Sequence, residues 1–341
     1  MSEAIKDSDK GHWVNRSPLS VRPFLQLSRL DRPVGYWLLA LPGWIGLAFA
    51  TLSHGLEVSD LKWAVLILIG AIAMRGAGCT YNDIIDQDLD AQVERTALRP
   101  LPAGTITTKQ AWIWLFVQCG VGLIVLLCLP RLAQIISLCS IPLVAAYPFM
   151  KRITWWPQLW LGLTFNWAVL VAYAAKTGTL NPPLLILYTG LIFWTVGYDT
   201  IYACQDIEDD MKIGVKSTAR RFGRQIKLGV GVCYSLCFLL ISYGSFVEFM
   251  QYSGPPNVSF KHSKFFLTSP ILSPFFLVLI WQTLTLKPNN SINSLKRFKS
   301  NFWAGIVLIC VILIPSHLID RHYKNHYCEN RQNEYCERRG Y

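Results

Sequence analysis

Charge is scarce in this chain, and negative charge is the scarcest. Asp, Glu, Lys and Arg make up 16% of the 341 residues, and 21 acidic residues stand against 32 basic ones, for a formal net charge of +11. Hydrophobic residues account for 52% of the chain. This composition is too apolar for an ordinary soluble domain of this length, so we expect a membrane protein.

Flexible linkers and an N-terminal targeting signal are also missing. No Gly/Ser-rich or low-complexity segment interrupts the chain, which predicts a single membrane domain. The first 33 residues lack the apolar segment of a cleavable secretory signal, and their Asp and Glu residues are unlike an Arg-rich mitochondrial transit peptide. We therefore expect insertion into the endoplasmic reticulum or Golgi membrane, with the mitochondrial inner membrane as the alternative.

Ten cysteines are present, but they do not form the pattern of a disulfide framework. Eight of them lie in or near hydrophobic segments, where cysteine acts as a small apolar side chain. Cys328 and Cys336 lie in the polar tail, and whether they pair is left open. Asn257 begins an Asn-Val-Ser glycosylation sequon, and its modification is open as well.

Apolar runs long enough to cross a bilayer, about 18 residues or more, occur nine times. They predict an all-α polytopic membrane protein with about nine transmembrane helices. The predicted domains are a cytosolic N-terminal segment (1–33), a membrane domain (34–319) and a polar C-terminal tail (320–341). The predicted spans cover residues 34–53, 60–78, 110–130, 132–149, 157–175, 182–204, 228–247, 265–286 and 302–319.

The basic residues are divided unevenly between the two sides that nine spans define. The side of the N-terminal segment carries 21 Lys and Arg residues, and the opposite side carries ten. The positive-inside rule then places the N-terminus and the two longest connections of that side, 80–110 and 205–227, in the cytosol. Because the cations are scattered among hydrophobic spans, the expected partner is the lipid bilayer and not a nucleic acid.

The few acidic residues gather in two clusters, each at the end of a predicted span. Asn82–Asp90 and Gln205–Asp210 together hold eight of the 21 acidic residues. Carboxylates at such density repel one another unless a cation joins them. Hard divalent ions are suited to that role, because they take oxygen ligands and commonly bridge to phosphate. The clusters therefore predict Mg²⁺-dependent chemistry on a diphosphate, with six candidate ligands: Asp83, Asp86, Asp90, Asp206, Asp209 and Asp210.

Helical geometry supports this interpretation over a solvated acidic loop. In a helix, Asp83, Asp86 and Asp90 fall within about 60° of one another, whereas Asp88 points about 140° away. In the second cluster the three aspartates also share a face. If the helix is continuous, Asp199 lies on that face about 10 Å deeper in the membrane, with Tyr202 between. A carboxylate inside the membrane is costly, which makes it a functional candidate.

Cations and a phenol near the clusters suit the binding of an anion. Tyr147 and Lys151 lie four residues apart, on one face at the cytosolic end of the fourth predicted span. Arg75 lies inside a span, where either a structural ion pair or substrate binding explains it. The basic residues that follow the two clusters are Arg95, Arg99, Lys212 and Lys216.

These motifs resemble the UbiA superfamily of intramembrane prenyltransferases. Asn82-Asp83-x-x-Asp86-x-x-x-Asp90 is similar to its NDxxDxxxD signature. The resemblance is strong from residue 28 to about residue 227 and continues weakly through Arg297–Gly305. Four further segments are similar to the 4-hydroxybenzoate polyprenyltransferase branch, together with the residues that precede the signature: Arg95–Leu101, Tyr147–Gln158, Tyr198–Asp210 and Lys212–Ala219.

The resemblance implies helices around a central cavity and transfer of a prenyl group from its diphosphate to an aromatic carbon. Carried over by motif position, Asp83, Asp86, Asp206 and Asp210 would hold two Mg²⁺ ions, supported by Asp90 and Asn82. Tyr147 and Lys151 would contact the diphosphate, with Arg95, Arg99, Lys212 and Lys216 nearby. Arg75 and Arg152 could bind the carboxylate of a benzoate, and Tyr202 would also contact substrate. The expected catalytic residues are Lys151 and, for deprotonation of the acceptor, Asp206 or Asp199.

Departures from the ubiquinone branch favour a different biological role. The loop 248–265 and the polar Cys-containing tail look unlike that branch, and the first 33 residues do not resemble a mitochondrial transit peptide. In these respects the chain resembles paralogues that prenylate aromatic polyketides in fungal meroterpenoid metabolism, with farnesyl diphosphate as the expected donor. A 4-hydroxybenzoate polyprenyltransferase of ubiquinone biosynthesis is the alternative. A divalent-cation carrier is a more remote one, because carriers hold ionisable ligands near the midplane of the membrane.

Overall fold

The computed structural model describes residues 11–92, 96–252 and 272–323, and in 251–252 and 315–323 the backbone alone. Every regular element in these ranges is a helix. The helices are α1 (Arg22–Leu27), α2 (Val34–His54), α3 (Ser59–Ile85), α4 (Gln87–Asp90), α5 (Thr108–Leu127), α6 (Arg131–Cys139), α7 (Ile141–Ile153), α8 (Pro157–Phe165), α9 (Trp167–Thr177), α10 (Pro182–Ala203), α11 (Ile207–Lys212), α12 (Thr218–Phe222), α13 (Ile226–Tyr252), α15 (Ser273–Thr285), α16 (Ser291–Lys299) and α17 (Asn301–Tyr323), with the 3₁₀ turns η1 (Trp13–Arg16) and η2 (Gly223–Gln225).

Eight helical segments are long and apolar enough to cross a membrane, judged by length and composition. The ninth predicted span, 265–286, begins outside the described residues, and its described part is the apolar helix α15. Exposed apolar side chains such as Phe116 and Leu239 lie on the outside of the bundle, as lipid-facing positions require. The predicted all-α membrane fold is therefore confirmed.

Two spans that the hydropathy pattern predicts as single helices are interrupted. The fourth is divided at Ser140 into α6 and α7, where Pro142 supplies no backbone N–H. The fifth is divided at Asn166 into α8 and α9. The buried Asn166 amide donates to the carbonyl oxygens of Gly162 and Leu191 at 2.8 and 3.1 Å. A buried amide that donates to backbone carbonyl groups offers an alternative to helical hydrogen bonds, so the carbonyl groups of Gly162 and Leu191 keep a donor where the chain bends.

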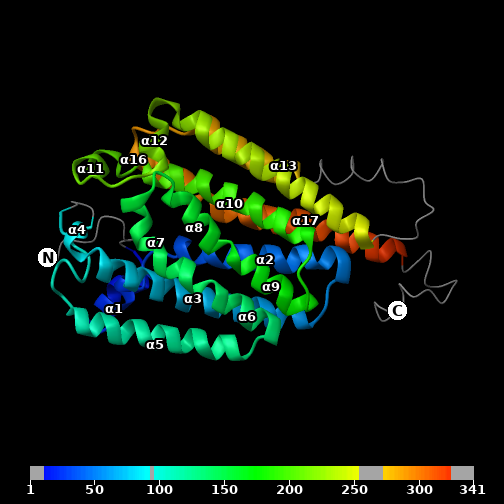
Figure 1. Cartoon of the computed structure of the whole chain (residues 1–341), viewed down its shortest axis with the longest axis horizontal. Coiled ribbons are helices and arrows are strands. Elements are labelled where there is room, and N and C mark those ends of the chain that lie inside the picture. The colour runs from blue at the N-terminus through cyan, green and yellow to red at the C-terminus, as the bar shows by residue number, and fades with distance from the viewer. Residues whose placement is uncertain (1–10, 93–95, 253–271, 324–341) are drawn as a thin grey trace.

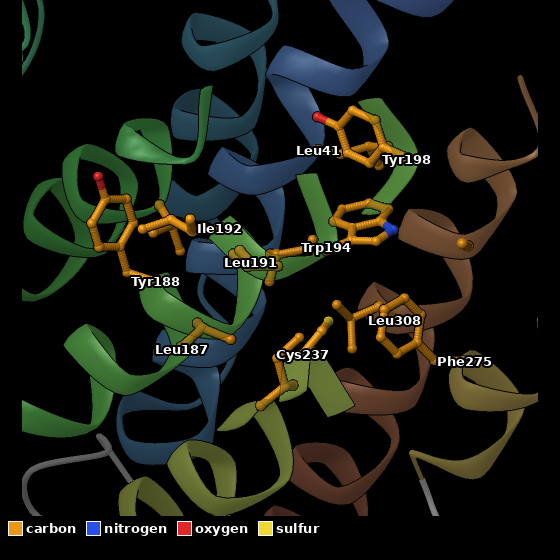
Figure 2. Packing of buried hydrophobic residues seen from close by; sticks show 14 of the residues in the cluster. Leu41, Leu187, Tyr188, Leu191, Ile192, Trp194, Tyr198, Cys237, Phe275 and Leu308 are labelled. Atoms are coloured by element: carbon orange, nitrogen blue, oxygen red, sulfur yellow. The ribbon is translucent and has the colours of Figure 1, made fainter. Parts of the chain in front are cut away.

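The hydrophobic core is centred on α10, which packs against α8, α13 and α16. Figure 2 shows Trp194 of α10 between residues of the neighbouring helices, with Phe275 and Leu308 beside it. Its ring meets Tyr198 and Phe275 edge-on, at centroid distances of 5.5 and 5.9 Å. Its indole N–H donates to Asn301 Oδ1 at 2.9 Å, so the buried ring leaves no unpaired donor.

Close helix approach depends on small residues, as is usual where lipid surrounds a bundle. A Cβ at Gly46 of α2 would lie 2.6 Å from the carbonyl oxygen of Val169 in α9, so only glycine permits this crossing. The long helices run roughly parallel to the long axis of the molecule. Figure 1 shows α4, α11, α12 and α16 at one end of that axis, which we call the motif end.

Candidate active site at the motif end

The first acidic cluster spans the end of α3 and the short helix α4. A break at Asp86 separates them, but helical hydrogen bonds continue across it, from Asp86 N to Asn82 O at 2.9 Å and from Asp90 N to Asp86 O at 2.8 Å. The helical register therefore persists. Asp83, Asp86 and Asp90 are buried and Asp88 is exposed, as their predicted directions require.

Asp83 is held by two arginines. Arg29 donates from Nη2 to both carboxylate oxygens, at 2.6 and 2.8 Å, and Arg99 Nη1 approaches Oδ1 at 3.3 Å. Arg99 Nη1 also donates to Asp90 Oδ2 at 2.7 Å. The predicted proximity of Arg99 to the cluster is therefore observed. Arg29 was not among the predicted site residues, because it lies before the first span and outside every motif.

Asp86 is held by the end of α7. Lys151 Nζ lies 2.5 Å from Oδ2, and Arg152 Nη2 lies 2.9 Å from Oδ1. The carboxylate of Asp86 is fully buried, whereas 44% of the Arg152 side-chain surface remains exposed. Both residues were predicted to bind substrate. In this structure they pair with a predicted metal ligand.

Burial and ion pairing act in opposite directions on the groups around Asp83. Burial raises the pKa of Asp90, and the nearby Asp83 charge adds to the rise, while Arg99 opposes it. Burial disfavours the charged form of Arg29, but the Asp83 carboxylate outweighs that effect and raises the pKa of Arg29 above its ordinary value. Arg29 therefore stays charged, and the pair carries a buried ionic interaction.

The second acidic cluster does not continue α10, which corrects the predicted register. α10 ends at Ala203, residues 204–206 form a turn, and α11 begins at Ile207. Asp199 therefore belongs to a different helix from Asp209 and Asp210. Lys212 pairs with Asp209 at 3.0 Å, in an exposed i, i+3 contact that contributes little energy.

The loop after α11 joins the two clusters through the end of α7. The backbone N–H of Lys216 donates to the carbonyl oxygen of Lys151 at 3.0 Å, and Lys216 Nζ donates to Ile153 O at 3.0 Å. Lys151 itself holds Asp86. At the start of α12, which follows this loop, the hydroxyl of Thr218 lies 2.6 Å from that of Thr200, which ties the end of the loop to α10. Segments more than 100 residues apart in sequence are thereby fixed next to one another.

Three polar residues lie deeper, between the two clusters. Tyr147 of α7 is within electrostatic reach of Asp86, Asp199 and Arg75. Asp199 is likewise coupled to Arg75 and to Asp206. Tyr147, Asp199 and Arg75 each keep some accessible surface although protein surrounds them. This position suits contact with a substrate that enters between the clusters.

Arg75 has an unused hydrogen-bonding group. Its Nε is buried and has no hydrogen-bond partner within the part of the chain that the structure describes. Its guanidinium lies over the ring of Phe165, 5.2 Å from the centroid. A Cβ at Gly35 would lie 2.9 Å from Nε, so glycine makes the room that this side chain occupies. A buried unpaired donor is costly and marks a position where a ligand atom can bind.

The other predicted site residues are placed as follows. Tyr202 packs against Phe298 of α16, with ring centroids 4.6 Å apart. Asn82 is half-buried, and its carbonyl oxygen accepts the hydrogen bond that spans the break at Asp86. Arg95 lies outside the described residues, as do Asn257, Cys328 and Cys336.

The six predicted metal ligands do not form a preformed cluster. Among the described residues, no three His, Cys, Asp or Glu side chains lie close enough together to hold a metal ion. The physical reason is charge balance: Arg29, Arg99, Lys151 and Arg152 provide the cations that the dense carboxylates need. These carboxylates still fit Mg²⁺. Each has about four lone-pair positions, and the Asp86 side chain accepts hydrogen bonds from Lys151 and Arg152 at only two of them.

Comparison with known proteins agrees with this geometry. The model of the UbiA prenyltransferase family matches residues 39–306. The mitochondrial 4-hydroxybenzoate polyprenyltransferase of Arabidopsis thaliana is 38% identical over 89% of this chain and 71% of that protein. Its human counterpart is 48% identical over 63% of this chain, which spans 57% of the human protein. 4-Hydroxybenzoate geranyltransferase 2 of Lithospermum erythrorhizon is 36% identical over 91% of this chain and 96% of that protein.

A solved structure shares the architecture. The UbiA homologue of Archaeoglobus fulgidus bound to GPP and Mg²⁺ superposes with a TM-score of 0.61, covering 87% of this chain and 99% of that one. Only 16% of the aligned residues are identical, so the likeness concerns the fold.

Proposed function

The chain belongs to the UbiA prenyltransferase family, and from that premise we propose that it transfers a prenyl group from its diphosphate to the ring of 4-hydroxybenzoate. The observation that carries the proposal is the pairing of acidic and basic side chains at the motif end. Asp86 with Lys151 and Arg152, and Asp83 with Arg29 and Arg99, combine ligands for a divalent cation with cations for a diphosphate.

The carboxylates would hold Mg²⁺ from both clusters, with Asp83 and Asp86 on one side and Asp206 and Asp210 on the other. Mg²⁺, when bound, offsets the negative charge of the diphosphate and makes it a better leaving group. Asp90 would support the site through Arg99, which contacts both Asp90 and Asp83.

The basic side chains that now pair with Asp86 would turn to the diphosphate when it binds. Lys151 is flexible and carries three donors, and Arg152 can present two parallel N–H groups to a phosphate. Arg152 is the more exposed of the two. Tyr147 lies one helical turn before Lys151 and would donate its hydroxyl to the same group.

The acceptor would bind deeper, with its carboxylate at Arg75. The unpartnered Nε of Arg75 is the specific observation, because the carboxylate of an acidic acceptor forms a charge-assisted hydrogen bond with that donor, which is stronger than the hydrogen bond of a neutral phenol. Arg75 also lies within electrostatic reach of Tyr147 and Asp199. The ring would therefore sit between the diphosphate end and Asp199.

The bonds that break and form in this reaction, and the side chain that would accept the released proton, can be named. The allylic C–O bond of the donor breaks and releases diphosphate, and the resulting carbocation forms a C–C bond ortho to the acceptor hydroxyl. The ring proton at that carbon passes to a carboxylate, for which Asp199 is the candidate because it lies deepest. Asp206, the other predicted candidate, is electrostatically coupled to Asp199 and lies closer to the leaving group.

The relatives favour the second of the two roles that the sequence predicted. The three relatives named above act on 4-hydroxybenzoate by name, and two of them are mitochondrial by name. We therefore propose a role in ubiquinone biosynthesis and a mitochondrial membrane location. None of the three relatives named above supports the fungal meroterpenoid role, a farnesyl donor or a location in the endoplasmic reticulum or Golgi. Because the relatives include polyprenyl and geranyl transferases, they do not determine the donor length.

The test is an assay of the membrane-embedded protein with labelled prenyl diphosphates of several lengths. Acceptors would be 4-hydroxybenzoate and, matched in size, its neutral methyl ester and a polyketide-derived phenol. We expect labelled product with 4-hydroxybenzoate and Mg²⁺, and a loss of product when EDTA is added. Asp206→Ala should abolish turnover, whereas the exposed Asp88→Ala should leave it unchanged.

Two outcomes contradict the proposal. If prenyl transfer continued in EDTA, the carboxylates would not be needed to hold a metal ion. If prenyl transfer to the neutral phenols were as fast as transfer to 4-hydroxybenzoate, or faster, Arg75 would not be the site that binds the acceptor carboxylate. The prenylation of a polyketide-derived phenol would then be favoured.

A further inference from the structure

A group of exposed cations lies at the motif end, outside the candidate active site. Figure 1 shows two of the contributing helices, α12 and α16, together at this end of the bundle. The segments are joined by a hydrogen bond from Lys227 Nζ at the start of α13 to Leu284 O at the end of α15, at 3.3 Å. We call this group the basic rim, and it consists of Arg221, Arg224, Lys227, Lys287, Lys296 and Lys299.

The stretch of the chain that carries the basic rim contains almost no acidic residues to neutralise it. From Met211 to Leu318 the sequence contains a single acidic residue, Glu248. Glu248 is buried, and its hydrogen-bond partners Ser53 and Asn181 lie at the opposite end of the bundle. The basic rim therefore has no acidic side chain from its own stretch of the chain beside it, and in the preceding helix α11 Asp209 pairs with Lys212.

Exposed apolar side chains adjoin the basic rim. Leu228 follows Lys227 directly and is 63% exposed, and Leu284, which is 71% exposed, precedes Lys287 by less than one helical turn. Ile292 of α16 is 67% exposed. Cations immediately beside exposed aliphatic side chains match the boundary between lipid headgroups and acyl chains.

We propose that the basic rim binds the headgroups of anionic phospholipids in the leaflet at the motif end. Charge complementarity favours an anion, and each Lys or Arg near an acidic lipid surface contributes appreciably to binding. The adjoining apolar side chains favour a lipid over inorganic phosphate or a soluble anionic polymer, because only a lipid places acyl chains against them. The positive-inside rule explains why cations lie on this side, but it does not require them to cluster beside exposed aliphatic residues.

The short helix α16 connects the basic rim to the candidate active site. Its apolar side faces the bundle, where Phe298 contacts Tyr202 of the candidate active site and the Arg297 guanidinium lies 3.9 Å from the ring centroid of Trp281. Lys296 and Lys299, on its other side, are exposed. A lipid held by these lysines would hold α16 against the bundle. The proposal itself concerns binding, and it does not depend on the identity of the acceptor or donor.

The test compares the wild-type protein with the triple variant Lys287→Gln, Lys296→Gln, Lys299→Gln. Delipidated protein in a neutral detergent is titrated with phosphatidylglycerol, and bound lipid is counted by native mass spectrometry. We expect the triple variant to bind phosphatidylglycerol at least roughly tenfold more weakly. Phosphatidylcholine should bind both proteins equally, and raised salt should weaken the wild-type interaction.

The matched control is the triple variant Arg16→Gln, Lys109→Gln, Arg131→Gln, which removes the same charge from exposed positions elsewhere. It should bind phosphatidylglycerol like the wild type. Equal binding by the rim variant and the wild type would overturn the proposal, as would equal weakening in the control. If inorganic phosphate protected the wild type from thermal unfolding as strongly as phosphatidylglycerol does, the proposal that the ligand is a lipid would be wrong. A thermal midpoint of the rim variant unchanged in phosphatidylcholine establishes that it is folded.

Discussion

At Arg29 the backbone adopts a left-handed conformation, with φ of 57°, at a residue that has a side chain to strain it. Such a conformation costs about 1–2 kcal/mol for a residue other than glycine. The neighbouring Ser28 is fixed by hydrogen bonds from Trp114 and Gln118, both at 2.7 Å. The strained turn directs the guanidinium onto Asp83. Strain that persists beside a candidate site indicates that the contact it produces matters for function.

Substitutions at Arg29 should separate the effect of its charge from that of its strain. Arg29→Ala leaves buried Asp83 with the more distant Arg99 alone, and we expect prenyl transfer to fall about 10- to 100-fold, which corresponds to the loss of a charged hydrogen bond. Arg29→Gly should reduce prenyl transfer to the same extent as Arg29→Ala. Its free energy of unfolding should be about 1 kcal/mol higher than that of Arg29→Ala, because glycine adopts the left-handed conformation without strain. Transfer rates and thermal midpoints in detergent are the measurements, with exposed Arg16→Ala as the control. Full activity of Arg29→Ala would exclude a role for this contact.

Gly35 gives a test of Arg75 that leaves Arg75 itself unchanged. In Gly35→Ala the new Cβ would meet the Nε of Arg75 at 2.9 Å, and the flexible side chain would have to move. We expect a folded protein whose KM for 4-hydroxybenzoate rises about tenfold, because small displacements of a positioned group reduce binding strongly. The KM for the prenyl diphosphate should not change. Gly78→Ala, whose Cβ would meet no atom within 4 Å, is the matched control. An unchanged KM for 4-hydroxybenzoate in Gly35→Ala would place the acceptor elsewhere.

At the scale of helices, hydropathy predicted the positions of the spans well and their interruptions poorly. The predicted span 182–204 differs from α10 by one residue, because a continuous apolar run leaves little choice. The break at Asn166 was missed, since it depends on carbonyl groups of a helix 25 residues away that the sequence does not reveal. The turn before α11 was missed for a similar reason. Asp206 begins that helix with φ of −115°, and helical periodicity alone gives no sign of it.

Four helices meet at one buried carboxylate at the end opposite the motif end. Glu248 of α13 accepts hydrogen bonds from Ser53 of α2 at 2.7 Å and from Tyr173 of α9 at 2.9 Å. Asn181, which caps the start of α10 through Leu184 N, donates to its other oxygen at 2.7 Å. A single side chain thus satisfies donors from three neighbouring helices in the interior.

Loss of this acceptor should loosen the bundle at that end. We expect Glu248→Ala to destabilise the protein by about 1–3 kcal/mol, because buried donors lose their partner. The measurement is the thermal unfolding midpoint of the purified protein in detergent, compared with Glu208→Ala at an exposed position. Because Glu248 lies far from the motif end, the KM values of the remaining folded enzyme should be unchanged. A midpoint equal to that of the wild type would show that these hydrogen bonds contribute no net stability.

For the molecule as a whole, the sequence predicted which residues lie at the same end of the helix bundle more reliably than which residues form direct contacts. Asp83, Asp86 and Lys151 were predicted as neighbours from motif position, and the structure places them together at the motif end. The partner of each carboxylate was not predictable, because Arg29 and Arg152 reach the cluster from segments 54 and 66 residues distant. Long-range pairing of this kind depends on the packing of whole helices, which local patterns do not encode.

The division of the molecule into two ends predicts its orientation in the bilayer. Asp88 and Lys296 are exposed at the motif end, whereas Glu57 is exposed at the start of α3, at the other end. In a cysteine-free background and sealed vesicles, a membrane-impermeant maleimide should label Asp88→Cys and Lys296→Cys from the same side. Glu57→Cys should be labelled from the opposite side, and buried Ile45→Cys from neither until the protein is unfolded. The excess of basic residues predicts that the motif end faces the compartment from which the protein inserts. Labelling of Asp88→Cys and Lys296→Cys from different sides would place the acidic clusters and the basic rim on opposite sides of the membrane and would contradict the single motif end that the structure shows.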